Sequence, residues 1–85
     1  SIASRLQSQV VGLKAAKTNA SLGNSFLQTA YTGLTSIREV LEEMKSLATQ
    51  ANSGSLTSSD RQLLQQEFEQ LQDEVDRLAS STSFN

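Results

Sequence analysis

The chain has 85 residues and a formal net charge of −2, and it contains no cysteine, histidine or proline. These absences exclude disulfides, thiol chemistry and the usual zinc ligands. Hydrophobic residues make up only 36% and aromatic residues 5% of the chain, which is too little for a globular interior but enough for a narrow apolar layer between helices.

A hydrophobic repeat in steps of three and four runs from Ile2 to Ala51, and we call it the seam. Steps that alternate in this way average about 3.5 residues, the period of helices that supercoil around a partner. We therefore predict one helix over about 1–52, which begins at or before Ser1 because the repeat is already in phase at Ile2. The positions of the seam are Ile2, Leu6, Gln9, Leu13, Ala16, Ala20, Gly23, Leu27, Ala30, Leu34, Ile37, Leu41, Met44, Ala48 and Ala51.

The segment after Ala51 predicts the end of this helix and the start of another. Gly54 suits the left-handed conformation that closes many helices, and a loop is expected over about 53–57. Thr57 and Asp60 have the spacing of a capping box, in which the two side chains accept hydrogen bonds from each other's backbone amides.

The second predicted helix covers about 58–80 and has its own apolar stripe. We expect Asp73 and Arg77 to pair on its solvent face, because residues four apart on a helix are neighbours. Phe84 and Asn85 are assigned to a further element. The stripe consists of Leu64, Phe68, Leu71, Val75 and Leu78.

The connection of about five residues predicts an antiparallel hairpin. The fold class is thus all-α, a long helix plus a shorter antiparallel helix, as part of an elongated coiled-coil-like bundle. At 1.5 Å per residue the arms span roughly 75 Å and roughly 33 Å. The expected register pairs Leu47 with Leu64, Met44 with Phe68, Leu41 with Leu71, Ile37 with Val75 and Leu34 with Leu78.

Because the arms differ in length, the seam between residue 2 and about residue 27 has no partner within the chain. Leu6, Leu13 and Leu27 are therefore expected to form an interaction surface. A second apolar line, which we call the flanking line, consists of Phe26, Gly33, Val40 and Leu47. It widens the stripe enough to favour a bundle of three or more helices.

Charge is distributed unevenly along the chain. Residues 1–37 carry three basic and no acidic residues, and residues 38–85 carry four basic and nine acidic residues. Three basic residues in 37 are too few for a nucleic-acid arm. We expect the polarity to favour staggered contacts between acidic and basic regions of neighbouring copies.

No catalytic, metal or cofactor site is predicted. No lysine or carboxylate is placed to activate a serine or threonine, and the acids at 42–43 and 73–76 are interpreted as solvated helix faces. Asn19-Ala20-Ser21 matches the N-glycosylation pattern but lies mid-helix with Ala20 in the seam. No apolar run approaches the roughly 18 residues that span a bilayer, so we expect a soluble chain or one whose targeting segment lies elsewhere.

Several stretches resemble the N-terminal conserved rod region of bacterial flagellins, and together they cover nearly the whole chain. They include Ile2-Ala3-Ser4-Arg5-Leu6, Gln28-Thr29-Ala30, Leu41-Glu42-Glu43-Met44-Lys45-Ser46-Leu47-Ala48-Thr49-Gln50-Ala51-Asn52, Gln66-Glu67-Phe68-Glu69-Gln70-Leu71 and Val75-Asp76-Arg77-Leu78-Ala79. The resemblance implies a long helix, a turn, a shorter antiparallel helix and a returning C-terminal helix as third partner. It also implies that the terminal tube segments, the outer domains and that C-terminal helix are absent here.

The same resemblance implies a structural, non-enzymatic subunit of the extracellular flagellar filament. Its expected partners are other flagellin subunits, its own C-terminal helix, and the flagellar export chaperone and cap. Alternatives are a hook-filament junction protein, which shares the rod pattern, a signalling coiled-coil hairpin, and an adaptor that only binds helices. A signalling hairpin would have arms of equal length, which the predicted helices do not.

The resemblance further implies a contact surface for Toll-like receptor 5. The positions that match are Glu43, Leu47, Gln50 and Glu67. Many flagellins carry a basic residue where this chain has Glu43, and a glutamate cannot donate hydrogen bonds as a guanidinium does. We therefore expect receptor activation to be weak or absent.

Overall fold

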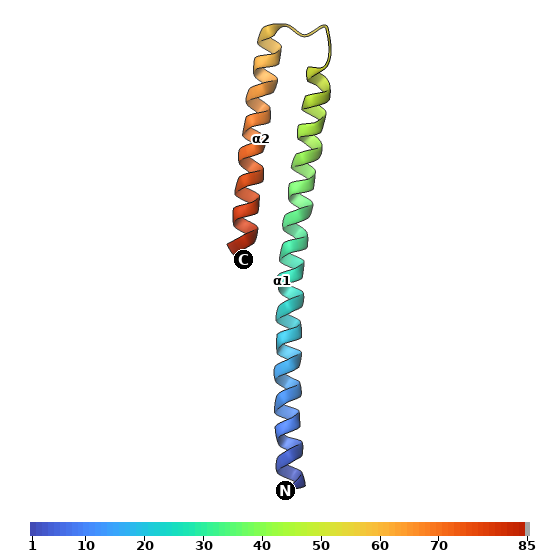
Figure 1. Cartoon of the computed structure of the whole chain (residues 1–85), viewed down its shortest axis with the longest axis vertical. Coiled ribbons are helices and arrows are strands. Elements are labelled where there is room, and N and C mark those ends of the chain that lie inside the picture. The colour runs from blue at the N-terminus through green and yellow to red at the C-terminus, as the bar shows by residue number, and fades with distance from the viewer. Residues whose placement is uncertain (85) are drawn as a thin grey trace.

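The computed structural model describes residues 1–84 and contains two helices joined by a short turn (Figure 1). Helix α1 runs from Ile2 to Ala51, and helix α2 runs from Ser58 to Phe84. Figure 1 shows α2 antiparallel to α1 and beside its C-terminal half only. The molecule is 83 Å long. The predicted all-α fold, with one long helix and a shorter antiparallel one, is confirmed.

Helix α2 is longer than the predicted helix, which ends near residue 80. Phe84 belongs to α2 rather than to a further element, and Asn85 lies outside the described residues. The serines and threonines after Ala79 are only moderately poorer helix formers than alanine, so they do not end a helix by themselves. Thr82 also lies against Gly33 of α1, which gives the last turns of α2 a packing contact.

Serine and threonine side chains inside α1 bond to the helix itself. The hydroxyls of Thr35 and Thr49 each donate to the carbonyl four residues earlier, at 2.9 Å in both cases. At the start of the helix, the Ser1 hydroxyl accepts from the amide of Ser4 at 3.2 Å. The two threonine bonds satisfy their hydroxyls without breaking the backbone ladder, and the Ser1 bond satisfies a free amide at the helix start.

The turn closes without the left-handed glycine that the sequence suggests. Gly54 does not have a positive φ angle. Instead Asn52, with φ −78° and ψ −6°, continues right-handed geometry, and its amide donates to the carbonyl of Thr49 at 3.2 Å. The amide of Ser53 donates to the carbonyl of Gln50 at 3.1 Å. Bonds of this i to i−3 type tighten the last turn and satisfy carbonyls that a regular helix end leaves free.

The capping box at the start of α2 is present as predicted. The amide of Asp60 donates to Thr57 Oγ1 at 3.1 Å, and the amide of Thr57 donates to Asp60 Oδ2 at 3.1 Å. These reciprocal bonds, together with the favourable position of an acid near a helix N-terminus, fix where α2 begins.

The helices pack through one side of the seam and the flanking line. Leu47 is the only buried apolar residue among those described, at 9% exposure, and Gly33 and Val40 of the same line are half-buried. The residues of α1 and α2 that share this interface at half-buried positions are Ala30, Ile37, Met44, Ala51, Leu64, Phe68, Leu71, Val75 and Leu78.

The structure differs from the expected register at Leu34 and Leu41. These residues are 64% and 50% exposed, and Gly33 and Val40 are half-buried one position before them. The flanking line is apolar only from Phe26 onward, over about the length that α2 can cover. Rotation of α1 toward this line lets the short helix bury a fully apolar stretch, while the seam residues Leu34 and Leu41 stay available on its other side.

Candidate assembly surface

One line of exposed apolar residues repeats every seven positions along nearly the whole of α1. We call it the open line, and every residue in it is exposed. Its N-terminal part extends beyond α2, as the lower half of Figure 1 shows, and its C-terminal part runs alongside the hairpin. The open line consists of Leu6, Leu13, Ala20, Leu27, Leu34, Leu41 and Ala48.

The regular repeat of exposed apolar residues distinguishes the open line from isolated exposed residues such as Val11 and Leu63. Leu6, Leu13 and Leu27 are 55%, 71% and 68% exposed. Single exposed apolar residues are common on protein surfaces, but a long contiguous row marks an interaction site. The prediction that α1 has an unpartnered N-terminal half agrees with the short reach of α2.

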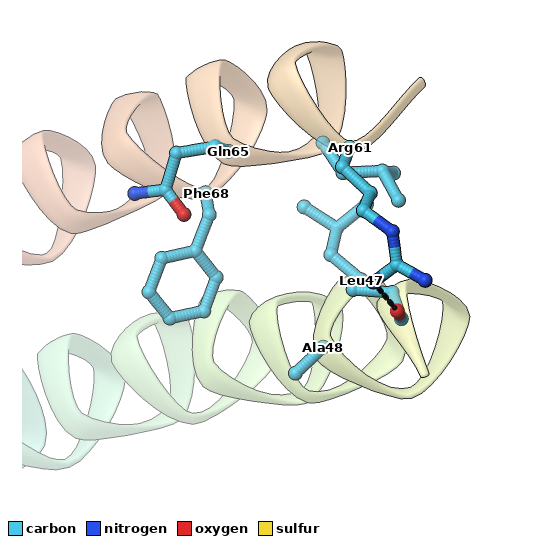
Figure 2. A pocket seen from close by; sticks show the side chains of 7 residues that line it. Leu47, Ala48, Arg61, Gln65 and Phe68 are labelled. Carbon is cyan, nitrogen blue, oxygen red and sulfur yellow. Dashed lines mark hydrogen bonds between the residues drawn. The ribbon is translucent and has the colours of Figure 1, made fainter. Parts of the chain in front are cut away.

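At the tip of the hairpin the open line meets a groove between the two helices. The groove has a volume of about 260 Å³ and is lined by Leu47, Ala48, Ala51, Arg61, Leu64, Gln65 and Phe68. Figure 2 shows Phe68 projecting from α2 toward α1, Gln65 beside it on α2, and Arg61 at the end nearest the turn. The walls are mainly apolar, so the groove is suited to apolar side chains of a packed helix.

Arg61 closes the end of the hairpin by bonding across the turn. Its Nη1 donates to the carbonyl of Ala51 at 2.8 Å, drawn as a dashed line in Figure 2, and its Nη2 donates to the carbonyl of Ser53 at 3.1 Å. A guanidinium at these carbonyls provides donors for free acceptors. Its positive charge also interacts favourably with the negative end of the dipole of α1. The sequence interpretation missed this role, although a basic residue in the first turn after a short loop is a usable signal for it.

The expected solvent-face pair on α2 forms with a different acid. Arg77 bonds Glu74, three residues away, with Nε 2.9 Å from Oε2, rather than Asp73. Glu74 is half-buried beside the interface, and residues three apart on a helix are neighbours as are residues four apart. The hydrogen bond from Arg77 lowers the pKa of Glu74 below its ordinary value and raises the pKa of Arg77.

The four candidate receptor positions are not equally accessible. Glu43 and Gln50 are exposed on α1 and Glu67 is exposed on α2. Leu47 lies between the helices at 9% exposure and lines the tip groove. A protein docking on this face would therefore meet the three polar side chains, with Leu47 fixing the spacing of the helices beneath them.

Other kinds of site find no support among residues 1–84. Within that range there is no group of three acidic side chains arranged to hold a metal ion. Neither helix, over the same residues, is long and apolar enough to cross a membrane.

Comparison with known proteins identifies a family over the whole chain. Residues 1–85 match the family model described as the bacterial flagellin N-terminal helical region. A flagellin of Clostridium tyrobutyricum is 38% identical over 84 residues, covering 99% of this chain and 22% of that protein. Flagellin B of Vibrio cholerae is 42% identical over 83 residues, covering 98% and 22%.

A third relative carries a more specific name. The flagellar filament core protein flaB2 of Brachyspira hyodysenteriae is 39% identical over 84 residues, covering 99% of this chain and 30% of that protein. The chain thus spans less than a third of these relatives' length, and no solved structure matches it. The chain belongs to the bacterial flagellin family and corresponds to the N-terminal helical region of that family.

Proposed function

We propose that this chain is the N-terminal half of the rod region of a flagellar filament subunit. In this proposal the protein is structural, has no enzymatic activity, and assembles outside the cell through helix packing to enable motility. The observation that carries it is the open line, an exposed apolar row that runs from Leu6 to Ala48. The names of the relatives, flagellin and filament core protein, support the same role.

The proposed partners follow from the extent of the open line. Other flagellin subunits and the protein's own C-terminal helix would cover it, because α2 reaches only the hairpin half of α1. The terminal tube segments and outer domains would lie in the parts of the protein beyond this chain. The flagellar export chaperone and cap are partners that family membership suggests.

Polymerisation of the full-length protein tests the proposal. Leu13→Glu places a charge in the open line, and burial of an unpaired charge is strongly unfavourable, so we expect electron microscopy to show few or no filaments. Thr18→Glu is the matched control, because residue 18 lies on the opposite side of α1 and is also exposed. Absence of filaments from the unmodified protein under polymerising conditions, or normal filaments from Leu13→Glu, would contradict the proposal.

We also propose that the chain is a weak ligand of Toll-like receptor 5. The support is Glu43 alone, whose carboxylate is exposed where many flagellins carry a basic residue, whereas Leu47 and Glu67 match the family pattern. A carboxylate at residue 43 would repel an acidic receptor group where a basic residue would bind it, and like-charge contacts oppose association.

A further inference from the structure

The open line has a basic edge. Lys17, Arg38 and Lys45 each lie four residues after one open-line residue and three residues before the next, which places them directly beside that line. All three are exposed. No aspartate or glutamate occupies the equivalent heptad position anywhere along α1. We call these three residues the basic edge.

Intramolecular pairing leaves the basic edge available. Within residues 1–84 one contact involves it: Arg38 Nε lies 3.9 Å from Glu42 Oε1, with both side chains about 70% exposed. A pair at this distance and exposure contributes little. The other acids of α1, Glu39 and Glu43, lie on the side of the helix that faces away from the open line.

The α2 side of the open face carries amides beside a carboxylate. Gln65 lines the tip groove and donates from Nε2 to Glu69 Oε1 at 3.2 Å, and Gln72 lies one heptad further along. The Arg61 guanidinium at the end of the groove is already bonded to two carbonyls of the turn. The cationic side chains beside the open line that remain available therefore belong to α1, in the basic edge.

We propose that the open face binds a helix that has an apolar heptad repeat and carboxylates along the edge that faces α1. The inference rests on the proposed packing of this hairpin against a further helix, and it specifies the chemistry of that helix. A continuous occupant would follow the open line from Leu6 to Ala48, roughly 63 Å at 1.5 Å per residue.

A second copy of this chain does not fit the same face. If two α1 helices met antiparallel through their open lines, Leu13 of one would face Leu41 of the other. Lys17 of each copy would then lie opposite Arg38 of the other. Like charges at such positions oppose association, so the face discriminates against itself and in favour of an acidic partner.

Two synthetic helices test the proposal directly. Both have about 40 residues and the same leucine and alanine heptad core, but one carries glutamate and the other lysine at the positions that flank the core. We expect the glutamate peptide to bind the 85-residue chain about tenfold more tightly at low salt, since three weak ion pairs together give about that factor. The difference should shrink as salt screens it.

Charge-neutralised variants of the chain provide the control. Lys17→Gln, Arg38→Gln and Lys45→Gln together should abolish the preference, whereas Glu39→Gln, Glu43→Gln and Glu67→Gln together should leave it. Equal binding of the two peptides would overturn the charge inference while leaving the filament proposal intact. Binding of neither peptide, or a dimer of the chain in sedimentation, would also overturn it, and filament formation by the full-length protein is scored separately.

Discussion

Replacement of Gly33 with alanine would force α1 and α2 apart near the end of α2. A Cβ atom built on Gly33 falls against the Thr82 side chain, 2.8 Å from Cγ2 and 3.0 Å from Cβ, and still nearer to Oγ1. Because both branches of Thr82 and its Cβ are involved, rotation about χ1 cannot clear the methyl group. The backbones themselves would have to separate.

The expected magnitude is the difference between two effects. Alanine is a better helix former than glycine by up to about 1 kcal/mol, which favours the variant. Overpacking of a close contact costs typically about 1–3 kcal/mol, which opposes it. We therefore expect Gly33→Ala to destabilise the hairpin by about 1 kcal/mol, in contrast to the same change at a glycine without neighbours.

Urea unfolding followed by circular dichroism at 222 nm measures this difference. Gly23→Ala is the matched control, because nothing lies within 4 Å of its added Cβ; we expect it to raise helicity or stability. Thr82→Ala in the Gly33→Ala background should recover most of the loss by removing both branches of the threonine. If Gly33→Ala proved as stabilising as Gly23→Ala, the close approach at Thr82 would be refuted.

Three further predictions concern the turn and the receptor face. Arg61→Ala should destabilise the hairpin by about 1 kcal/mol in urea unfolding, because two carbonyls lose a charged donor. Arg61→Lys should recover only part of the lost stability. Equal stability of the unmodified chain and both variants would contradict this prediction. Bonds from Thr57 lower the pKa of Asp60 below its ordinary 3.8, so the stabilisation by the Asp60 carboxylate is present above that pH and lost as the pH falls through the lower folded value. Asp60→Asn should flatten the fall of the free energy of unfolding at acid pH. An unchanged pH profile of stability would count against the capping bond. Glu43→Arg in the full-length protein should strengthen binding to Toll-like receptor 5, and robust nanomolar signalling by the unmodified protein would show that Glu43 is no obstacle.

Features that depend on short sequence separation were predictable. The capping box of Thr57 and Asp60 follows from residue types at fixed spacing, and the apolar stripe of α2 follows from helical periodicity. The structure departs from the sequence prediction where two local ways of closing a helix end compete. Gly54 permits a left-handed closure, but tightening at Asn52 and the guanidinium of Arg61 satisfy the same carbonyls.

The rotation of α1 against α2 required tertiary information, although the sequence contains the reason for it. Seam and flanking line both repeat every seven residues, so periodicity alone cannot say which of them faces α2. Their lengths can. Upstream of Phe26 the flanking line continues as Asn19, Gly12 and Arg5, which are polar or small, whereas the open line stays apolar back to Leu6.

A short partner helix and a long partner helix therefore pack on different lines of α1. The flanking line is apolar over about the length that α2 covers, and α2 packs on it from Gly33 to Leu47, whereas Phe26 is exposed. The open line is apolar over nearly all of α1 and is exposed throughout, so it matches a partner about as long as α1. Because each line matches its partner in length, the hairpin can close first and still present an unobstructed surface for assembly.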